Sequence, residues 1–285
     1  MQQFPRTEVA GVSLPRMLIG SNWIRGHSHK SAAMDAWISE RYAQKEAFWP
    51  VLETFLNYGI DAAMAGFSTD RLLVEAIREA EQRAGKKIIL IDTPGVNMND
   101  STEGRREAEA QIKACADAGA TFCLILHSSV EQLVNKNKRI IDRLPDYTKM
   151  IRDHGMIPGL SAHMPEIIIY SDENEYDVQT YIQIYNCLGF LMQVEIEQVA
   201  RIIHHAKKPV MTIKPMAAGR TTPYIGLNFA YNTLRDCDMV TVGAYDAREA
   251  AEDVEIGLAA IDRRYPAIKM RSSTSKQALF DFINY

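Results

Sequence analysis

Short apolar runs alternate with longer segments of helical periodicity along the chain of 285 residues. Segments of the second kind place apolar residues three or four positions apart, as an amphipathic helix does. Repeated alternation of this sort is typical of βα units that build a parallel sheet. The predicted strands are residues 16–21, 60–65, 87–92, 121–127, 156–161, 180–186, 209–214 and 239–243.

Several helix ends can be predicted from capping residues, prolines and glycines. Thr222 precedes Pro223, which suits the first position of a helix because its missing N–H needs no partner there. Asp246 and Glu249 have the spacing of a capping box. Further helices are expected over about 68–84 and 101–118, each ending before a glycine, one or two helices over 128–154, and a short one within 164–176.

Eight strand–helix units in one chain of this length predict an α/β protein, a single (β/α)₈ TIM barrel over residues 1–285. We expect a long first βα loop over about 22–43, extended across the top of the barrel, and a C-terminal tail over about 264–285. A doubly wound open sheet is the alternative fold. That fold usually carries G-x-G-x-x-G after its first strand, and the sequence here is "SNWIRGHSH".

Composition narrows the classes of partner. The net charge is −4 and no block of Lys and Arg stands out, so neither nucleic acid nor a membrane is expected. The four cysteines form no CxxC pair and the N-terminus resembles no export signal, which predicts a cytoplasmic protein with reduced thiols. A homo-oligomer is possible, because the apolar tail "QALFDFINY" would pack on the barrel bottom or on a partner.

Side chains suited to chemistry follow most of the predicted strands. The carboxyl ends of barrel strands surround the active site in such folds, so these side chains are expected to converge. The candidates for acid–base catalysis are Asp92, His127, His163 and Lys214. The candidates for binding substrate or cofactor are Asn22, Arg25, His27, His29, Ser161, Tyr185, Asn186, Arg220 and Gly243.

Structural alternatives exist for several of these residues. Ser161 and Asn22 also suit a helix cap or a turn. His127 follows a fully apolar strand and would also fit a buried, hydrogen-bonded role. A lysine at a barrel mouth must be paired or bind an anion, and Asp92 is a possible partner for Lys214.

Two segments suggest ligand chemistry. In "KPMAAGRTTPY" (214–224), small residues allow close approach of a ligand, Arg220 offers a fork of donors, and a helix begins at Pro223, which together indicate a phosphate site. In "RGHSH" (25–29), His27 and His29 are candidate ligands of a divalent metal, although no carboxylate partner is evident. The same segment would alternatively form a lid over an anionic substrate.

Motifs in both halves of the chain resemble the aldo-keto reductase superfamily. The resemblance is carried by "FCLILHSS", "IPGLSAHMPE", "YIQIYN", "PVMTIKPMAAGR" and "VTVGAYDAREAAEDVEIGL" over roughly residues 120–260, and by "GIDAAMAGFSTDRLLVEAI" before them. It implies a (β/α)₈ barrel that binds NAD(P)H, with Ser161, Tyr185 and Asn186 forming part of a cofactor or substrate wall.

Three of the four catalytic positions of that family differ here. The family uses an Asp, Tyr, Lys and His tetrad; the Asp position is Met64, the Tyr position falls at Gly66 or Phe67, and the Lys position falls at Asp92 or Thr93. Only His127 matches. Carbonyl reduction needs a proton donor beside the hydride acceptor, and the family's usual donor is missing. Near the strand-eight segment, Asp246 argues against recognition of a 2′-phosphate.

Three functions remain open. The leading hypothesis is an enzyme that acts on a small phosphorylated or polyhydroxy carbonyl compound by acid–base chemistry, as an isomerase or epimerase, a lyase or an oxidoreductase. Lys214 would polarise the carbonyl or form a Schiff base. The second is a divergent NAD(P)H-dependent reductase in which His27 or His29 donates the proton. The third is a regulatory barrel that binds a nucleotide or metabolite without catalysis.

Overall fold

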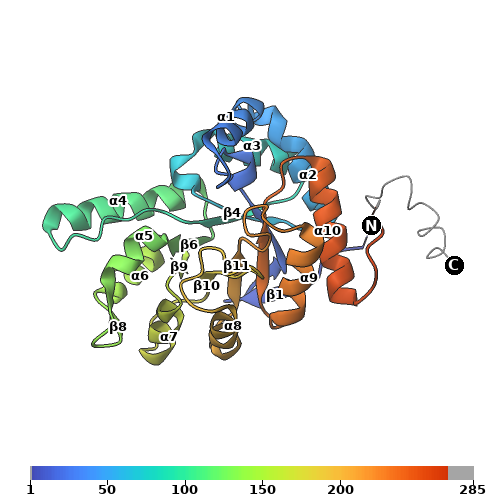
Figure 1. The fold of residues 1–285 in the computed structure, drawn as a ribbon. Coiled ribbons are helices and arrows are strands. Elements are labelled where there is room, and N and C mark those ends of the chain that lie inside the picture. Colours follow the sequence, from blue (N-terminus) through green and yellow to red (C-terminus); the bar gives the residue numbers. More distant parts are fainter. Residues whose placement is uncertain (1, 269–285) are drawn as a thin grey trace, which may run out of the picture.

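The computed structural model describes residues 2–268 and shows a closed barrel of eight parallel strands. The strands are β3 (Met17–Gly20), β4 (Ala62–Ala65), β5 (Ile89–Asp92), β6 (Phe122–Ile125), β9 (Ile157–Ala162), β10 (Tyr181–Ile184), β11 (Val210–Ile213) and β12 (Met239–Val242). Pairing of β12 with β3 closes the ring. The (β/α)₈ prediction is therefore confirmed, with helices arranged around the strands (Figure 1).

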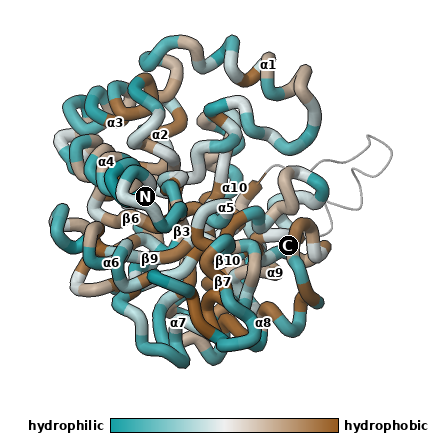
Figure 2. Tube along the Cα trace, turned by 90° about the vertical axis from the view of Figure 1, so that its left-hand side faces the viewer, coloured by the Kyte–Doolittle hydropathy of each residue, from teal (hydrophilic) through white to brown (hydrophobic). Residues whose placement is uncertain are grey.

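Side chains alternate between the inside and the outside of the barrel wall. Leu18, Met64 and Ile91 belong to the apolar cluster inside the barrel, whereas Ile19 and Leu90 pack against the outer helices. This alternation follows from the two-residue repeat of a strand. Both faces are apolar because parallel strands are covered on both sides. Figure 2 shows the hydrophobic segments gathered in the interior and the hydrophilic ones mainly on the surrounding helices.

An N-terminal hairpin that the sequence analysis did not predict precedes the barrel. It consists of β1 (Arg6–Val9) and β2 (Val12–Pro15). Val9 and Leu14 are buried in the apolar cluster inside the barrel. The hairpin therefore adds to the barrel interior, at the end from which the strands start.

Most helices lie where the sequence predicts them. Asp70 caps α3 with its side chain, Ser101 caps α4 and Thr222 caps α9, which has Pro223 in its first turn. Asp246 accepts from the N–H groups of Arg248 and Glu249 and so caps α10. The bounds are α3 (Arg71–Ala84), α4 (Thr102–Ala118), α7 (Glu166–Glu173), α9 (Pro223–Thr233) and α10 (Ala247–Asp262). One more helix, α8 (Ile196–His205), lies between β10 and β11, where no bounds were predicted.

Two segments differ from the prediction. The first loop, expected to be extended over 22–43, contains η1 (Asn22–Ile24) and α1 (Ala32–Arg41), and η2 (Lys45–Phe48) and α2 (Trp49–Asn57) follow it. Ser31 starts α1 by accepting from the Met34 N–H, a capping signal that the sequence analysis overlooked.

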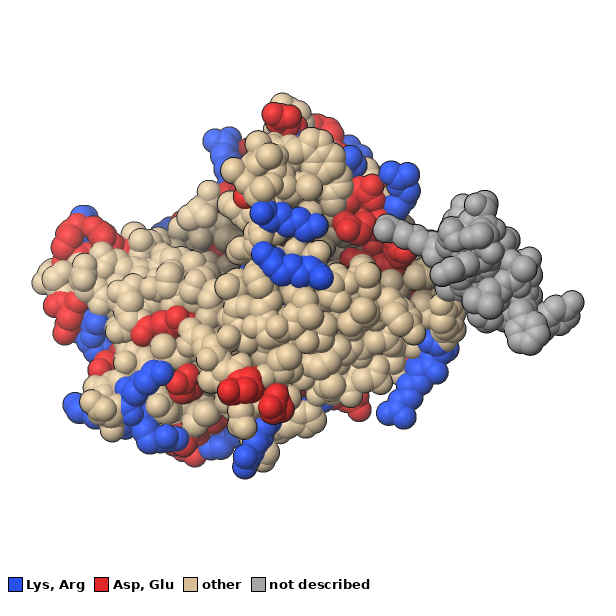
Figure 3. Space-filling view, viewed as in Figure 1, with Lys and Arg blue, Asp and Glu red and all other residues tan. Residues whose placement is uncertain are grey.

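The second segment is 128–154, where one or two helices were predicted. Two are present, α5 (His127–Val130) and α6 (Leu144–Asp153). The difference lies between them, where η4 (Glu131–Leu133) and a small hairpin of β7 (Val134–Asn135) and β8 (Ile140–Ile141) were not predicted. The predicted tail over 264–285 lies almost wholly outside the described residues, and so does "QALFDFINY". No helix within residues 2–268 is long and apolar enough to cross a membrane. Basic and acidic side chains are interspersed on the face shown in Figure 3.

Candidate functional site

A cavity of about 850 Å³ opens at the carboxyl end of the barrel. Each of the eight strands, or the residue directly after it, contributes to its lining, and α10 and the loop after β3 complete it. The cavity brings together nine of the predicted site residues: Asn22, Arg25, His27, His29, His127, Ser161, His163, Lys214 and Gly243. The other four, Asp92, Tyr185, Asn186 and Arg220, do not line it.

Two imidazoles form a stacked pair in this cavity. The ring centroids of His127 and His163 lie 3.8 Å apart, with the planes at 14°. His127 begins α5 directly after β6, and His163 follows β9, which pairs with β6. The backbone N–H groups of His163 and Met164 both donate to one carboxylate oxygen of Glu131, at 2.7 and 2.9 Å. Glu131 therefore fixes the turn that carries His163.

The surroundings keep both imidazoles neutral. Burial lowers the pKa of His163 to about 4, and the positive charge that His127 and Lys214 can carry adds to this effect. Burial also lowers the pKa of His127, with Glu131 opposing and Lys214 adding to the shift. A neutral imidazole can accept a proton, so either ring is suited to general-base chemistry near neutral pH.

Lys214 reaches the cavity through an unusual backbone turn. Its neighbour Ile213 packs toward the barrel interior, so regular alternation would send Lys214 outward. Instead Lys214 has φ +61°, in the left-handed region that side chains rarely adopt, and its side chain lines the cavity. Burial lowers the pKa of Lys214.

The amine of Lys214 contacts the first loop. Its Nζ lies 2.9 Å from Nε2 of His29, and a protonated amine donates to that ring nitrogen. Burial lowers the pKa of His29, and the charge of Lys214 lowers it further. Among the residues of the structure, no carboxylate lies within 4 Å of Lys214. Lys214 is therefore a partly buried cation that has no acidic partner within residues 2–268.

Arg220 has a different place from the one expected. Its guanidinium donates to the carbonyl oxygens of Ala217 and His29, both at 3.2 Å, and lies 3.9 Å from the ring centroid of Phe190. The backbone N–H groups of Gly219 and Arg220 donate to Met216 inside the turn. The donors expected to hold a phosphate are thus already used, and Arg220 clamps the His29 segment over the β11–α9 loop.

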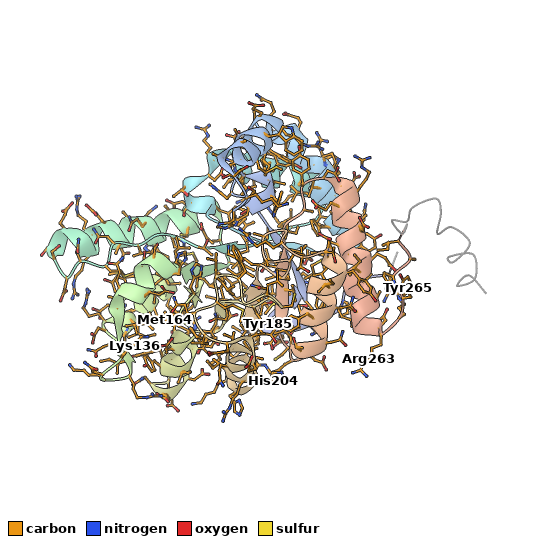
Figure 4. All side chains as sticks on the ribbon, viewed as in Figure 1. Lys136, Met164, Tyr185, His204, Arg263 and Tyr265 are labelled. Carbon is orange, nitrogen blue, oxygen red and sulfur yellow. The ribbon has the colours of Figure 1, made fainter. Side chains whose placement is uncertain are left out.

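Asp92, Tyr185 and Asn186 also face away from the cavity. Asp92 follows the inward residue Ile91, so its side chain points to the outer helices and accepts from the Ser68 N–H at 2.8 Å. Its burial is complete and raises its pKa. The hydroxyl of Tyr185, a side chain labelled in Figure 4, lies 2.9 Å from that of Thr233 on α9.

The amide side chain of Asn186 shapes its own loop. Its oxygen accepts from the N–H groups of Leu188 and Phe190, and its nitrogen donates to the Phe190 carbonyl. Arg25 does line the cavity, but its Nε pairs with Asp70 and its guanidinium lies 5.7 Å from the ring centroid of Phe48. Arg25 therefore holds the loop to α3 rather than offering a free positive charge.

Some residues of the cavity were absent from the predictions. Trp23 and Lys30 come from the loop after β3, and Glu249 and Asp253 come from α10. The inward position of Asp253 could have been predicted, because the residue shares the apolar face of α10 with Ala250 and Val254. The role of Glu131, which fixes the turn after β9 that carries His163, could not have been predicted, because it depends on how that turn folds.

Neither a metal site nor a strong 2′-phosphate site emerges from the side chains. Within the described chain, no group of three or more His, Cys, Asp or Glu residues could hold a metal ion. Arg248, the basic residue near the strand-eight segment, is exposed and lies 3.3 Å from the Asp246 carboxylate. Glu249 and Asp253 line the cavity beside it, and carboxyl groups there disfavour a phosphate.

The depressed pKa of His163 predicts a loss of stability in acid. Unfolding restores a pKa near 6.5, so the unfolded chain binds more protons and the folded state loses stability as the pH falls from about 6.5 to 4. After allowance for solvent screening, we expect this group to cost about 2 kcal/mol in the free energy of unfolding between pH 7 and pH 4.5.

Urea unfolding of the wild type and of His163→Gln at both pH values measures this cost. The variant should lose less stability than the wild type on acidification. His205→Gln, at an exposed histidine on α8, is the control and should behave as the wild type does. Equal losses in all three proteins would show that His163 has an ordinary pKa.

Comparison with known proteins supports the fold. No family model and no curated protein sequence matches the chain. Among solved structures, PA4992 of Pseudomonas aeruginosa, assigned as an aldo-keto reductase, matches with a TM-score of 0.65 and 11% identity over 92% of this chain and 98% of its own. The glycerol dehydrogenase AKR11B4 of Gluconobacter oxydans matches with a TM-score of 0.60 and 10% identity over 98% and 94%.

A third similar structure is the aldose reductase of Giardia lamblia, with a TM-score of 0.54 and 10% identity over 99% of this chain and 93% of its own. Similarity at such identities concerns the fold and not the chemistry. The cavity agrees with this distinction, since Met64, Gly66 and Thr93 line it near the positions where the resemblance would place Asp, Tyr and Lys. The chain therefore has the (β/α)₈ barrel fold of the aldo-keto reductases, with a different set of side chains at its mouth.

Proposed function

We propose that the protein is an enzyme that binds a small anionic carbonyl compound, such as a sugar phosphate or an oxo acid, and moves a proton next to the carbonyl group. The observation that carries this proposal is the combination of the Lys214 cation with the neutral pair His127 and His163 in one cavity. The cation suits a negative group or a developing enolate, and a neutral imidazole suits removal of a proton from carbon.

The backbone at Lys214 supports a functional role. Lys214, Ala217 and Ala218 all have positive φ angles, of +61°, +48° and +55°. Each such residue costs of order 1 kcal/mol or more, and backbone strain of this kind is concentrated at functional sites. The strain here has a definite result, because it turns an otherwise outward lysine into the cavity.

Charge balance inside the cavity favours an anionic ligand over a cationic one near Lys214. Arg25 is paired with Asp70, and Arg71 is paired with Glu75 at 2.8 Å. The hydrogen-bond partner of Lys214 within the described residues is the neutral ring of His29, which carries no negative charge. A ligand anion would supply the missing negative charge, and the half-buried site would strengthen that attraction relative to water.

The proposal is tested by a binding screen. Sugar phosphates, 2-oxo acids and their uncharged alcohol or sugar counterparts are titrated into the protein by calorimetry, and compounds that bind are tested for isomerisation, epimerisation and carbon–carbon cleavage. We expect anions to bind and the uncharged counterparts to fail. Binding of uncharged compounds alone would contradict the proposal.

A divergent nicotinamide-dependent reductase is the second candidate. It is favoured by the contact between His29 and Lys214, which places a possible proton donor in the cavity of a reductase-type barrel. The carboxyl groups of Glu249 and Asp253 favour NADH over NADPH as the cofactor of such an enzyme. Fluorescence titration with NADH and with NADPH tests this candidate. If neither nucleotide binds, the reductase is excluded.

A further inference from the structure

Asp253 is a buried carboxyl group that has no hydrogen-bond partner in the described part of the chain. Its side chain lies on α10, is 1% exposed and lines the cavity. Neither of its oxygens has a hydrogen-bond partner among the residues of the structure. Burial raises its pKa well above the usual range, and the negative charges of Glu249 and Glu252 contribute. An arrangement of this kind is costly, and buried polar groups without partners need an explanation.

A positively charged nitrogen already lies near these carboxyl groups. Nζ of Lys30 lies 5.2 Å from the ring centroid of Trp23, and its charge acts on Glu249. The Lys30 side chain crosses Gly219, where an added Cβ would lie 2.8 Å from Cε and 3.0 Å from Nζ. An aromatic face beside carboxyl groups is a favourable place for an ammonium group.

The cavity lining thus carries groups of both charges. Lys214 contributes a positive group, whereas Glu249 and Asp253 make the wall formed by α10 acidic. A hydroxyl group of a ligand would satisfy one oxygen of Asp253 and leave the charge of Glu249 unbalanced. An ammonium group would donate to Asp253 and balance the charge as well.

We propose that Asp253, Glu249 and Trp23 form a subsite for a positively charged nitrogen of the ligand, so that the ligand carries an amine as well as an anion. This inference rests on the proposed function, in which Lys214 binds the anionic group of the ligand. Lys30, on the loop after β3, places its ammonium group near Trp23 but donates no hydrogen bond to Asp253, so the carboxyl group is left for a ligand amine. The class of compound is an amino-substituted sugar phosphate or a similar amino carbonyl anion.

Binding of two matched probes tests the subsite. D-glucosamine 6-phosphate and D-glucose 6-phosphate differ only in the group at one carbon, and calorimetry gives the dissociation constant of each. We expect the amine to bind about 10-fold more tightly or better, which corresponds to one well-placed charged contact. Asp253→Asn should remove this preference, whereas Lys214→Met should weaken both probes.

The outcomes separate the two proposals. Equal binding of both probes by the wild type, with weakening of both by Lys214→Met, would overturn the amine subsite and leave the anionic site standing. Failure of both probes to bind would overturn the amine subsite for this class of compound, and insensitivity of binding to Lys214→Met would contradict the proposed function.

A measurement on the ligand-free protein tests whether Asp253 has a structural role instead. A carboxyl group kept for binding does not stabilise the free fold, so Asp253→Asn should leave the melting temperature unchanged or raise it by ~2–4 °C. A fall of more than about 5 °C would show that Asp253 has a partner in the fold and would overturn the subsite.

Discussion

Replacement of His163 by glutamine is expected to lower kcat by about 100- to 10,000-fold on a substrate found by the binding screen. The Kd of the ligand should stay within about twofold, because the imidazole moves a proton and does not carry the binding charge. Burial lowers the pKa of His163 to about 4, so its imidazole is neutral and can accept a proton from about pH 5 upward. Stopped-flow or steady-state kinetics together with calorimetry measure the two constants separately.

The pH profile gives a second readout of the same prediction. With a base of pKa about 4, kcat/KM should stay flat from pH 8 down to about 5 on account of this group, whereas an ordinary histidine would make it fall below pH 7. His154→Gln is the matched control, since His154 lies on the outside of the barrel beside Glu109. A control that loses activity as His163→Gln does, or an unchanged kcat in His163→Gln, would refute the role of the base.

Replacement of Asp238 by alanine is expected to lower the free energy of unfolding by about 3–5 kcal/mol. Asp238 is fully buried at the start of β12, and its oxygens accept from the Val210 N–H and from three N–H groups of Arg235, at 2.7–3.0 Å. The guanidinium of Arg235 in turn donates to the carbonyls of Ala206 and Lys208. Without the carboxylate, a poorly hydrated guanidinium and a buried N–H lose their partner.

Urea unfolding followed by circular dichroism measures this effect. Asp236→Ala is the control, because the Asp236 side chain is wholly exposed, and Arg16, its partner at 3.4 Å, keeps its hydrogen bonds to the carbonyl oxygens of Asp238 and Arg235. We expect the control to change stability by less than about 1 kcal/mol. Comparable losses in the two variants would show that the buried network does not hold β11 and β12 together.

The barrel could be predicted from the sequence because its signal is repeated eight times. Each strand is a short apolar run, and the turns and caps around it are separate signals that agree with it. The hairpin β1–β2 escaped prediction because it gives no such repeat. Its exposed positions, such as Arg6 and Glu8, interrupt the apolar pattern to which the buried Val9 and Leu14 belong.

The direction of single side chains could not be predicted in the same way. In "ILID" and "YIQIYN" both faces of the strand are apolar or buried, so the pattern does not tell which face points inward. Asp92 and Tyr185 were therefore assigned to the mouth although they fall on the outer face. Lys214 was assigned correctly to the mouth, but only its left-handed backbone brings it there, and no residue pattern indicates that conformation.

The most direct test of the account is the affinity of Lys214→Met for the tightest anion found in the screen, compared with that of Lys86→Met. Lys86 is an exposed lysine ahead of β5, away from the cavity lining, and so matches the change in charge and side chain. The account predicts that Lys214→Met weakens binding by about 100-fold, as expected for loss of a charged contact in a half-buried site, while Lys86→Met binds as the wild type does. Equal affinity in all three proteins would contradict the claim that this cavity binds an anion through Lys214.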